Sequence, residues 1–192
     1  SYSLSGVFLD QCEEYGQDVL DSFKALAATG KVEFLAETYY HSLAYLKSLD
    51  EFCSQVKAHT EKIQKHFGQT PKILRNTAHI YNHKMADTAR MKRGIIAAGA
   101  AHSLDGRTPN HPYMPPKFRL PKQTEMRVSR LRHLPERSES IYVLLKNYRL
   151  SDDIAFRFSD KSWIEHPVTA EKFTDWLCVS ADHNVNLFMD YE

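Results

Sequence analysis

Strand-like and helix-like segments alternate along the first half of the sequence, and this order restricts the folds that the chain can adopt. Residues 32–37 resemble a strand, and residues 49–67 have apolar side chains at helical spacing with a glycine after them. A strand over 73–77, a helix over 82–93 and a short apolar strand over 94–98 follow. Strands separated by helices pair in parallel, with the helices as crossovers. The sequence therefore predicts an α/β fold.

The same pattern frames the rest of the chain. We expect a helix over 7–30 that Gly30 ends, a buried strand over 141–148, a helix that starts at 151–153, a helix over 167–177 and a closing strand over 185–189. Residues 101–140 interrupt the pattern with Pro109, Pro112, Pro115, Pro116, Pro121 and Pro135. Proline denies a helix its hydrogen bonds, so this stretch is predicted to be an insertion or a lid.

About six strands separated by helices fit either a (β/α) barrel or an open doubly wound sheet. The chain has 7 glycines, and none is set as GxGxxG or GxxxxGK[ST], so a dinucleotide or phosphate cradle has no support. A barrel whose site lies at the carboxyl ends of its strands fits better. Residues 1–192 are expected to form one such domain.

Charge and cysteine content exclude several classes of partner. Lys and Arg number 25 against 24 Asp and Glu, so no excess of positive charge favours a nucleic acid. Three cysteines outside any CxxC spacing indicate neither a disulfide framework nor a zinc site, which favours a reducing, cytoplasmic location. No apolar run of about 18 residues predicts a membrane span. We expect no cofactor, and the oligomeric state is open.

Polar side chains cluster where the predicted strands end: Glu33, Glu37 and His41, then Arg75 and Asn76, then Asp152 and Asp153, then Asp190 and Glu192. Strand ends of a barrel meet at one mouth, so several carboxylates could share one pocket. Helix caps, solvated loop acids and ion pairs are the alternative interpretation. His79 and His83 have the i, i+4 spacing of a helical metal pair, but the Glu of HExxH is absent, so they are expected to flank the pocket instead.

Four ordered segments carry a resemblance to a known family: GKVEFLAETYYHS from Gly30, RNTAHIYN from Arg75, NYRLSDDIAFRFS from Asn147 and NLFMDYE from Asn186. They are similar to the α-amylase-type members of glycoside hydrolase family 57. The resemblance implies a partial, seven-stranded (β/α) barrel of the glycoside hydrolase/deacetylase type, followed by a helical region, that acts on α-1,4-glucans with retention of configuration. The family's first motif and its helical region lie outside this sequence, so an internal portion of a larger protein is expected.

The resemblance also assigns roles and identifies one departure. Retaining hydrolysis needs two carboxyl groups about 5–5.5 Å apart. By resemblance, Asp190 is the general acid/base, a role that needs a carboxyl shielded from water. The family reads RNTE where this chain reads Arg75-Asn76-Thr77-Ala78, and that Glu is the nucleophile. Ala78 therefore occupies a vacant nucleophile position, and the chain is expected to be impaired or inactive as a hydrolase.

Three interpretations of Ala78 stay open: a change made to trap substrate, natural divergence to a non-catalytic α-glucan-binding pseudoenzyme, or replacement of the lost group by Glu37 or Glu192. Divergence explains more, because His79 also departs from the leucine usual in the family. In each case the expected partner is an α-glucan or maltooligosaccharide, since aromatic faces and bidentate donors suit pyranose rings. The expected substrate contacts are Glu33, Glu37, Tyr39, Tyr40, His41, Arg75, Asn76, His79 and Asp153.

Overall fold

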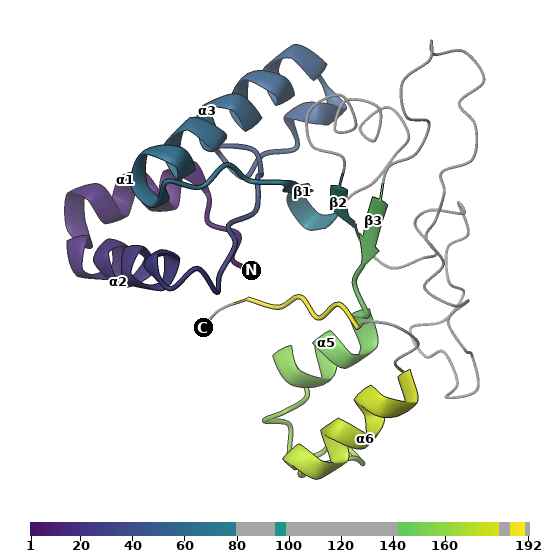
Figure 1. Cartoon of the computed structure of the whole chain (residues 1–192). Helices are drawn as coiled ribbons and strands as arrows, with labels where there is room; N and C mark the ends of the chain where they lie inside the picture. Colours follow the sequence, from purple (N-terminus) through teal and green to yellow (C-terminus); the bar gives the residue numbers. More distant parts are fainter. Residues whose placement is uncertain (80–94, 99–141, 181–184, 191–192) are drawn as a thin grey trace. The chain divides into compact units, whose positions relative to one another are not determined.

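The computed structural model describes residues 1–79, 95–98, 142–180 and 185–190 of the chain (Figure 1). The chain divides into two compact units, Ser1–Ala97 and Ala98–Glu192. The predicted helix over 82–93 and the predicted insertion or lid over 101–140 lie outside the described residues. The expectation of one domain over 1–192 stays a prediction.

Parallel backbone pairing organises the first unit, as the alternation of strands and helices predicted. The pairs follow chain order: Tyr2 with Phe34, Ala36 with Leu74, and β1 (Ile73–Arg75) with β2 (Ile95–Ala98). The predicted strand over 32–37 is reduced to two single bridges, because it pairs with one neighbour at Phe34 and with another at Ala36. Even so, the α/β order is confirmed for the first two connections, which contain α1, α2 and α3, and the connection from β1 to β2 lies outside the described residues.

Two helices replace the single one predicted over 7–30. The helices α1 (Gly6–Tyr15) and α2 (Gln17–Ala28) meet at Gly16, whose φ of −138° and ψ of 49° are not helical. Glycine is among the poorest helix formers, so the break falls where the backbone has least reason to stay helical. Gly30, with a φ of 67°, follows the end of α2 as predicted.

The long helix α3 (Leu49–Phe67) has the bounds predicted from the sequence. Its N-cap Ser48 accepts a 3.2 Å hydrogen bond from the amide of Glu51 through its hydroxyl. At the other end Gly68 has a φ of 66°, the left-handed conformation that closes many helices. A short 3₁₀ turn, η1 (Ala44–Leu46), precedes α3, and another, η2 (Thr77–His79), follows β1.

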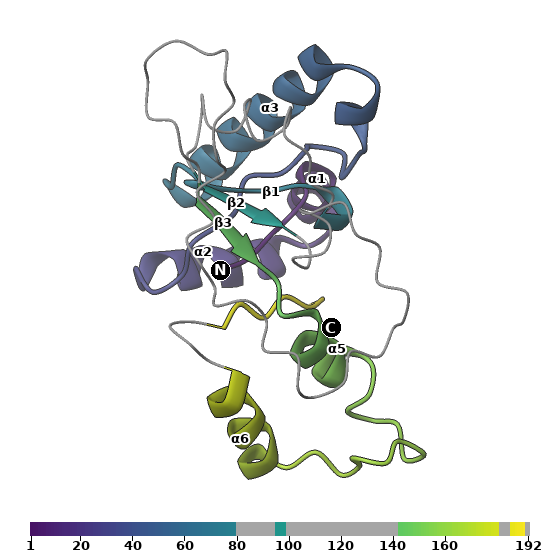
Figure 2. The same cartoon turned by 90° about the vertical axis from the view of Figure 1, so that its right-hand side faces the viewer.

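Phe34 lies at the centre of the core of the first unit. Its ring stacks on Phe67 at 4.1 Å between centroids, and Phe23 meets it edge-on at 6.3 Å. The same cluster takes Leu9 from α1 and Ile63 from α3, and both are fully buried. Figure 2 shows the three helices α1, α2 and α3 grouped beside β1. Burial of Phe34 therefore holds three helices on one strand segment.

Charged side chains join α1 to α3 at the surface of this core. Lys62 donates to Asp10 at 2.7 Å and also to Glu13, which accepts a second bond from Lys65 at 2.8 Å. The bonds from Lys62 and Lys65 lower the pKa of Glu13 to about 2. Because opposite charges favour the ionised carboxylate, this contact stabilises the fold only while Glu13 is charged.

The second unit contains β3 (Tyr142–Leu145), α5 (Tyr148–Ala155) and α6 (Ala170–Ser180). The predicted strand over 141–148 is too long and the predicted helix start at 151–153 too late, because Asn147 caps α5 by accepting a 3.1 Å bond from the amide of Leu150. The predicted helix over 167–177 is shifted to α6, and Thr169 bonds the amide of Lys172 at its start. The closing strand is reduced to a parallel bridge between Lys146 and Asn186.

Within the part of the chain that the structure describes, no helix combines the length and apolar character that crossing a membrane requires.

Replacement of Gly6 by alanine should destabilise the protein. A Cβ on Gly6 would lie 2.5 Å from Cγ of Tyr39. Because Cγ is the ring atom next to the Cβ of Tyr39, a rotation of the Tyr39 ring about this bond does not relieve the clash. We expect Gly6→Ala to lower the free energy of unfolding by about 1–3 kcal/mol, as overpacking does elsewhere. Urea unfolding measures this. Gly16→Ala is the matched control, because its Cβ would meet Cys12 at an ordinary 3.5 Å. Equal losses in the two variants would contradict the proposed clash.

The contact between α1 and α3 should weaken in acid. The pKa of Glu13 is lowered from 4.5 to about 2 in the folded protein, so its contribution is complete above pH 4.5 and is lost as the pH falls towards 2. Urea unfolding at a series of pH values should show this loss, and Lys62→Met should flatten it. Lys57→Met, which removes an exposed Lys57–Glu61 pair at 3.9 Å, should leave the slope unchanged. A Lys62→Met profile parallel to that of the wild type would argue against the assignment.

Candidate functional site

The carboxylate of Glu37 is the centre of a polar cluster in the first unit, and only 1% of the residue is exposed. Ser3 donates to its Oε1 at 2.9 Å, and His41 donates through Nδ1 to Oε2 at 2.8 Å. Arg75 reaches the same Oε2 through Nη1 at 3.4 Å. A buried carboxylate is tolerated when charged and polar donors surround it. Three separate segments of the chain supply these donors.

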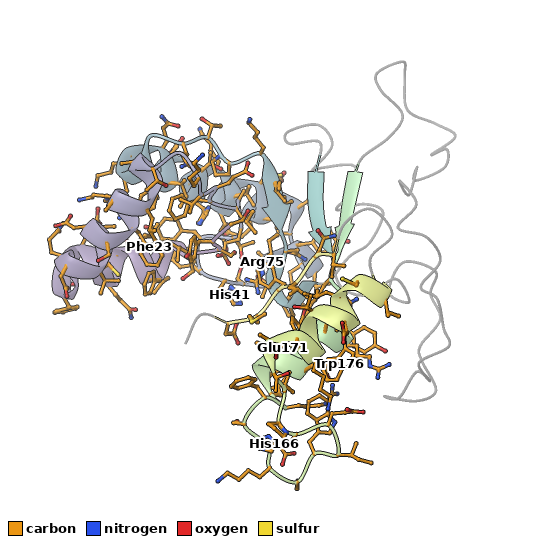
Figure 3. The ribbon with its side chains drawn as sticks, turned by 60° about the horizontal axis from the view of Figure 1, so that its bottom comes forward. Phe23, His41, Arg75, His166, Glu171 and Trp176 are labelled. Carbon is orange, nitrogen blue, oxygen red and sulfur yellow. The ribbon has the colours of Figure 1, made fainter. Side chains whose placement is uncertain are left out.

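His41 forms the accessible side of this cluster, and Arg75, whose side chain is 12% exposed, lies beside it (Figure 3). Nη1 of Arg75 lies 3.4 Å from Nδ1 of His41, and 48% of the His41 side chain is exposed. Since Nδ1 of His41 donates to Glu37, the neutral ring keeps its Nε2 lone pair as an acceptor. The cluster can therefore accept a hydrogen bond at His41 and donate hydrogen bonds from Arg75.

Threonine hydroxyls hold the turn that carries His41 against the turn that carries Ala78. Thr38 and Thr77 both donate to the carbonyl oxygen of Ser42, at 3.2 and 3.0 Å, and their hydroxyls lie 3.2 Å apart. His41 has a φ of 52° and Ala78 a φ of 54°. This left-handed conformation costs a side chain that is not glycine about 1–2 kcal/mol. Such strained residues cluster at functional sites, which marks both turns.

Tyr39 and Tyr40 lie beside this cluster in different environments. The hydroxyl of Tyr39 bonds the carboxylate of Asp10, 2.7 Å from Oδ1, and burial together with this bond raises its pKa. Tyr40 is 63% exposed and meets the Tyr39 ring edge-on at 5.0 Å. Tyr39 thus packs as part of the scaffold, and Tyr40 presents an aromatic face to solvent.

The other predicted site residues of the first unit are less accessible or only partly described. Asn76 is buried at the end of β1, and Glu33 is half-buried and accepts a 2.9 Å bond from the amide of Tyr2 through its carbonyl. The backbone of His79 belongs to η2, but the environment of its side chain lies outside the described residues. His83 lies outside them as well. Ala78 is exposed.

Asp153 and Asp190 belong to the second unit. Asp153 is buried inside α5 and pairs with Arg157 one turn later, so it is not in the first turn where the sequence placed it. Asp190 is exposed, which differs from the shielded position that its predicted role requires. It lies four residues beyond the bridge at Asn186. Glu192 lies outside them, and a shared pocket for Ala78 and Asp190 stays a prediction.

The structure brings three of the predicted site residues together, Glu37, His41 and Arg75, and adds Ser3, His59 and the threonine pair, which the sequence did not single out. His59 is fully buried on α3, and its position was visible in the sequence. It falls on the apolar face with Phe52, Val56 and Ile63, where a polar side chain needs a buried partner. Ser3 carried no such signal, since its bond to Glu37 spans 34 residues. Among the described residues, no three His, Cys, Asp or Glu side chains group as metal ligands.

Comparisons with known proteins agree on one family. The model of a family described as "Glycosyl hydrolase family 57" matches residues 1–192. A Methanocaldococcus jannaschii protein named "Putative alpha-amylase" is 38% identical over 195 residues, which take in 100% of this chain and 37% of that protein. The crystal structure of a 4-alpha-glucanotransferase from Thermococcus litoralis matches with a TM-score of 0.67 at 17% identity, over 98% of this chain and 26% of that one.

The likeness to the solved structure concerns the fold, and it covers only part of each larger protein. The structural match shows a shared fold and supports the (β/α)-barrel type predicted from the sequence. The chain spans only about a third of the curated relative and a quarter of the solved structure.

Replacement of Arg75 should show how much its charge stabilises the buried carboxylate of Glu37. Arg75→Met removes the positive charge beside the buried Glu37, and we expect a loss of about 3 kcal/mol in the free energy of unfolding, the lower end for a broken buried ion pair. We expect the lower end of that range because His41 still donates its shorter hydrogen bond to Glu37 in this variant. Urea unfolding measures this. Lys57→Met, at the exposed Lys57–Glu61 pair, is the control and should change stability by less than about 0.5 kcal/mol.

A second substitution separates the charge from packing. Adding Glu37→Gln to Arg75→Met should recover part of the loss, because no uncompensated carboxylate is then buried. A double variant that is less stable than Arg75→Met would show that the arginine stem, not its charge, carries the effect.

Proposed function

Since the chain belongs to glycosyl hydrolase family 57, we propose that it forms part of a protein that acts on or binds α-1,4-glucans. The names of the relatives support this substrate class: one is named "Putative alpha-amylase" and the other a 4-alpha-glucanotransferase. We further propose that the chain supplies a large part of a seven-stranded (β/α) barrel. In that barrel residue 78 and Asp190 would face the same hollow at the carboxyl ends of the strands.

Ala78 is the observation that carries the mechanistic part of the proposal. It occupies an exposed, left-handed turn three residues beyond Arg75, held by the hydroxyls of Thr38 and Thr77. In retaining hydrolysis a carboxylate at this position attacks the anomeric carbon while the second carboxyl, here Asp190, protonates the leaving oxygen and later deprotonates water. A methyl group cannot attack. The proposed enzyme therefore keeps the frame of the site and lacks the covalent step.

The sugar is proposed to lie against the accessible side of the Glu37 cluster. The exposed ring of Tyr40 suits the apolar face of a pyranose, and His41 and Arg75 can exchange hydrogen bonds with hydroxyl groups. Glu37 is itself too buried to reach a ligand directly, so its role is to orient His41 and Arg75 from behind. This arrangement would bind a glucan whether or not catalysis follows.

Glu37 is a poor substitute for the missing nucleophile. Both of its oxygens already accept hydrogen bonds, and it is 1% exposed, whereas an attacking atom must come within about 3–3.5 Å of its target. The second candidate function is therefore a non-catalytic α-glucan-binding or regulatory protein. The combination of a vacant position 78 with an intact Glu37, His41 and Arg75 cluster favours it.

Restoring the carboxylate tests both functions. Ala78→Glu in the complete protein should raise maltoheptaose cleavage or transfer by a factor on the order of 10⁶, the cost of losing a covalent nucleophile in a well-studied protease. Product analysis by chromatography measures this. Ala78→Gln is the matched control, since it has the same size and no nucleophilic oxygen, and it should stay inactive. Asp190→Asn added to Ala78→Glu should abolish the gain.

The unmodified protein offers a companion measurement. Azide can enter the space beside Ala78 and attack the anomeric carbon of an activated α-glucoside from the face opposite the leaving group. The leaving group departs as the new bond forms, so the product of this single displacement would be a β-glycosyl azide. Glucan binding without turnover in Ala78→Glu and without the azide product would favour the non-catalytic function. Absence of both glucan binding and turnover would contradict the α-glucan assignment.

A further inference from the structure

The N-terminal segment and the segment around Phe34 begin as a regular parallel pair. The amide of Tyr2 donates to the carbonyl of Glu33 at 2.9 Å, and the amide of Leu35 donates to the carbonyl of Tyr2 at 2.8 Å. In a continued parallel ladder this pattern repeats every two residues along both strands. The next bond in that series would run from the amide of Leu4 to the carbonyl of Leu35, and the one after it from the amide of Glu37 to the carbonyl of Leu4.

The imidazole of His59 stands between those two groups. The amide of Glu37 donates to its Nδ1 at 3.4 Å, and its Nε2 lies 2.7 Å from the carbonyl oxygen of Leu4. A carbonyl oxygen can only accept, so Nε2 carries the proton and Nδ1 is the acceptor. Both bonds are therefore consistent with one neutral tautomer. The ring replaces a single ladder bond by two bonds and separates the strands where they approach the cluster.

This insertion acts on the residue at the centre of the site. The amide that His59 binds belongs to Glu37, whose carboxylate meets Ser3, His41 and Arg75. Ser3 adjoins Leu4, the other backbone partner of the ring. An apolar side chain at position 59 would fill the same volume but would leave a buried amide and a buried carbonyl without this partner.

We propose that His59 is a positioning residue: by accepting from the Glu37 amide it sets the carboxylate that orients His41 and Arg75 towards the glucan. This proposal rests on the proposed function for its ligand, and on the inserted imidazole for its geometry. His59 is fully buried on α3 and so acts through Glu37, without contact to the sugar.

Two conservative variants separate the two bonds. The Asn oxygen in His59→Asn can occupy the place of Nδ1 and accept from the Glu37 amide, whereas the Gln nitrogen in His59→Gln can occupy the place of Nε2 and donate only to Leu4. Ile63→Ala, one turn further along α3 and fully buried, is the control for lost stability. Maltoheptaose binding by calorimetry and thermal unfolding are measured on the complete protein for all three.

We expect His59→Gln to weaken maltoheptaose binding about tenfold and His59→Asn less than about threefold, because only the first loses the acceptor for Glu37. Ile63→Ala should lower the unfolding midpoint and keep the affinity. Equal weakening by Asn and Gln, or affinity losses that follow stability in all three variants, would overturn the positioning role.

Hydrogen exchange of the Glu37 amide keeps the test independent of the ligand. If the wild type fails to bind maltoheptaose, the proposed function is wrong. The exchange rate of the Glu37 amide then still tests whether His59 holds that amide. It should exchange faster in His59→Gln than in His59→Asn or Ile63→Ala. The same exchange rate in all three variants would refute the inference.

Discussion

Burial of the Glu37 carboxylate is the constraint on which the first unit and its site depend. A buried carboxylate needs donors close at hand, and here they come from the N-terminal segment, from the turn after Glu37 and from β1. These segments are far apart in the sequence, so the charge is satisfied only when the parallel pairs and the core around Phe34 are in place. Stability and site geometry are therefore coupled: whatever moves a strand also moves His41 and Arg75.

The backbone at position 78 keeps a conformation that its present side chain does not require. Alanine gains nothing from a φ of 54°, yet the two threonine hydroxyls and the carbonyl of Ser42 hold the turn. Strain of this kind persists when the surrounding structure determines it. If the proposed vacancy at Ala78 is right, the turn keeps its backbone without the carboxylate that the proposed mechanism needs.

Helices contribute to the site through buried polar contacts as well as through the core. The helix α3 brings Ile63 to the Phe34 cluster, Lys62 to the acidic residues of α1 and His59 to the two strand segments. One amphipathic helix thus meets the apolar core, the surface charges and the backbone behind Glu37. Because these contacts lie within about one and a half turns of one rigid element, they position the strands and α1 relative to each other.

The sequence by itself determined the features that depend on neighbours along the chain. The bounds of α3 follow from a serine cap, an apolar stripe and a glycine stop, and the parallel α/β order follows from the alternation of segments. The resemblance in the four segments identified the family, and it predicts the vacancy at Ala78. Tertiary structure alone decided that the strand over 32–37 shortens to two bridges and that Ser3 and His59 complete the environment of Glu37. The physical reason is range: caps and periodicity act over a few residues, whereas a buried charge or backbone amide takes whichever donor or acceptor the folded chain brings to it.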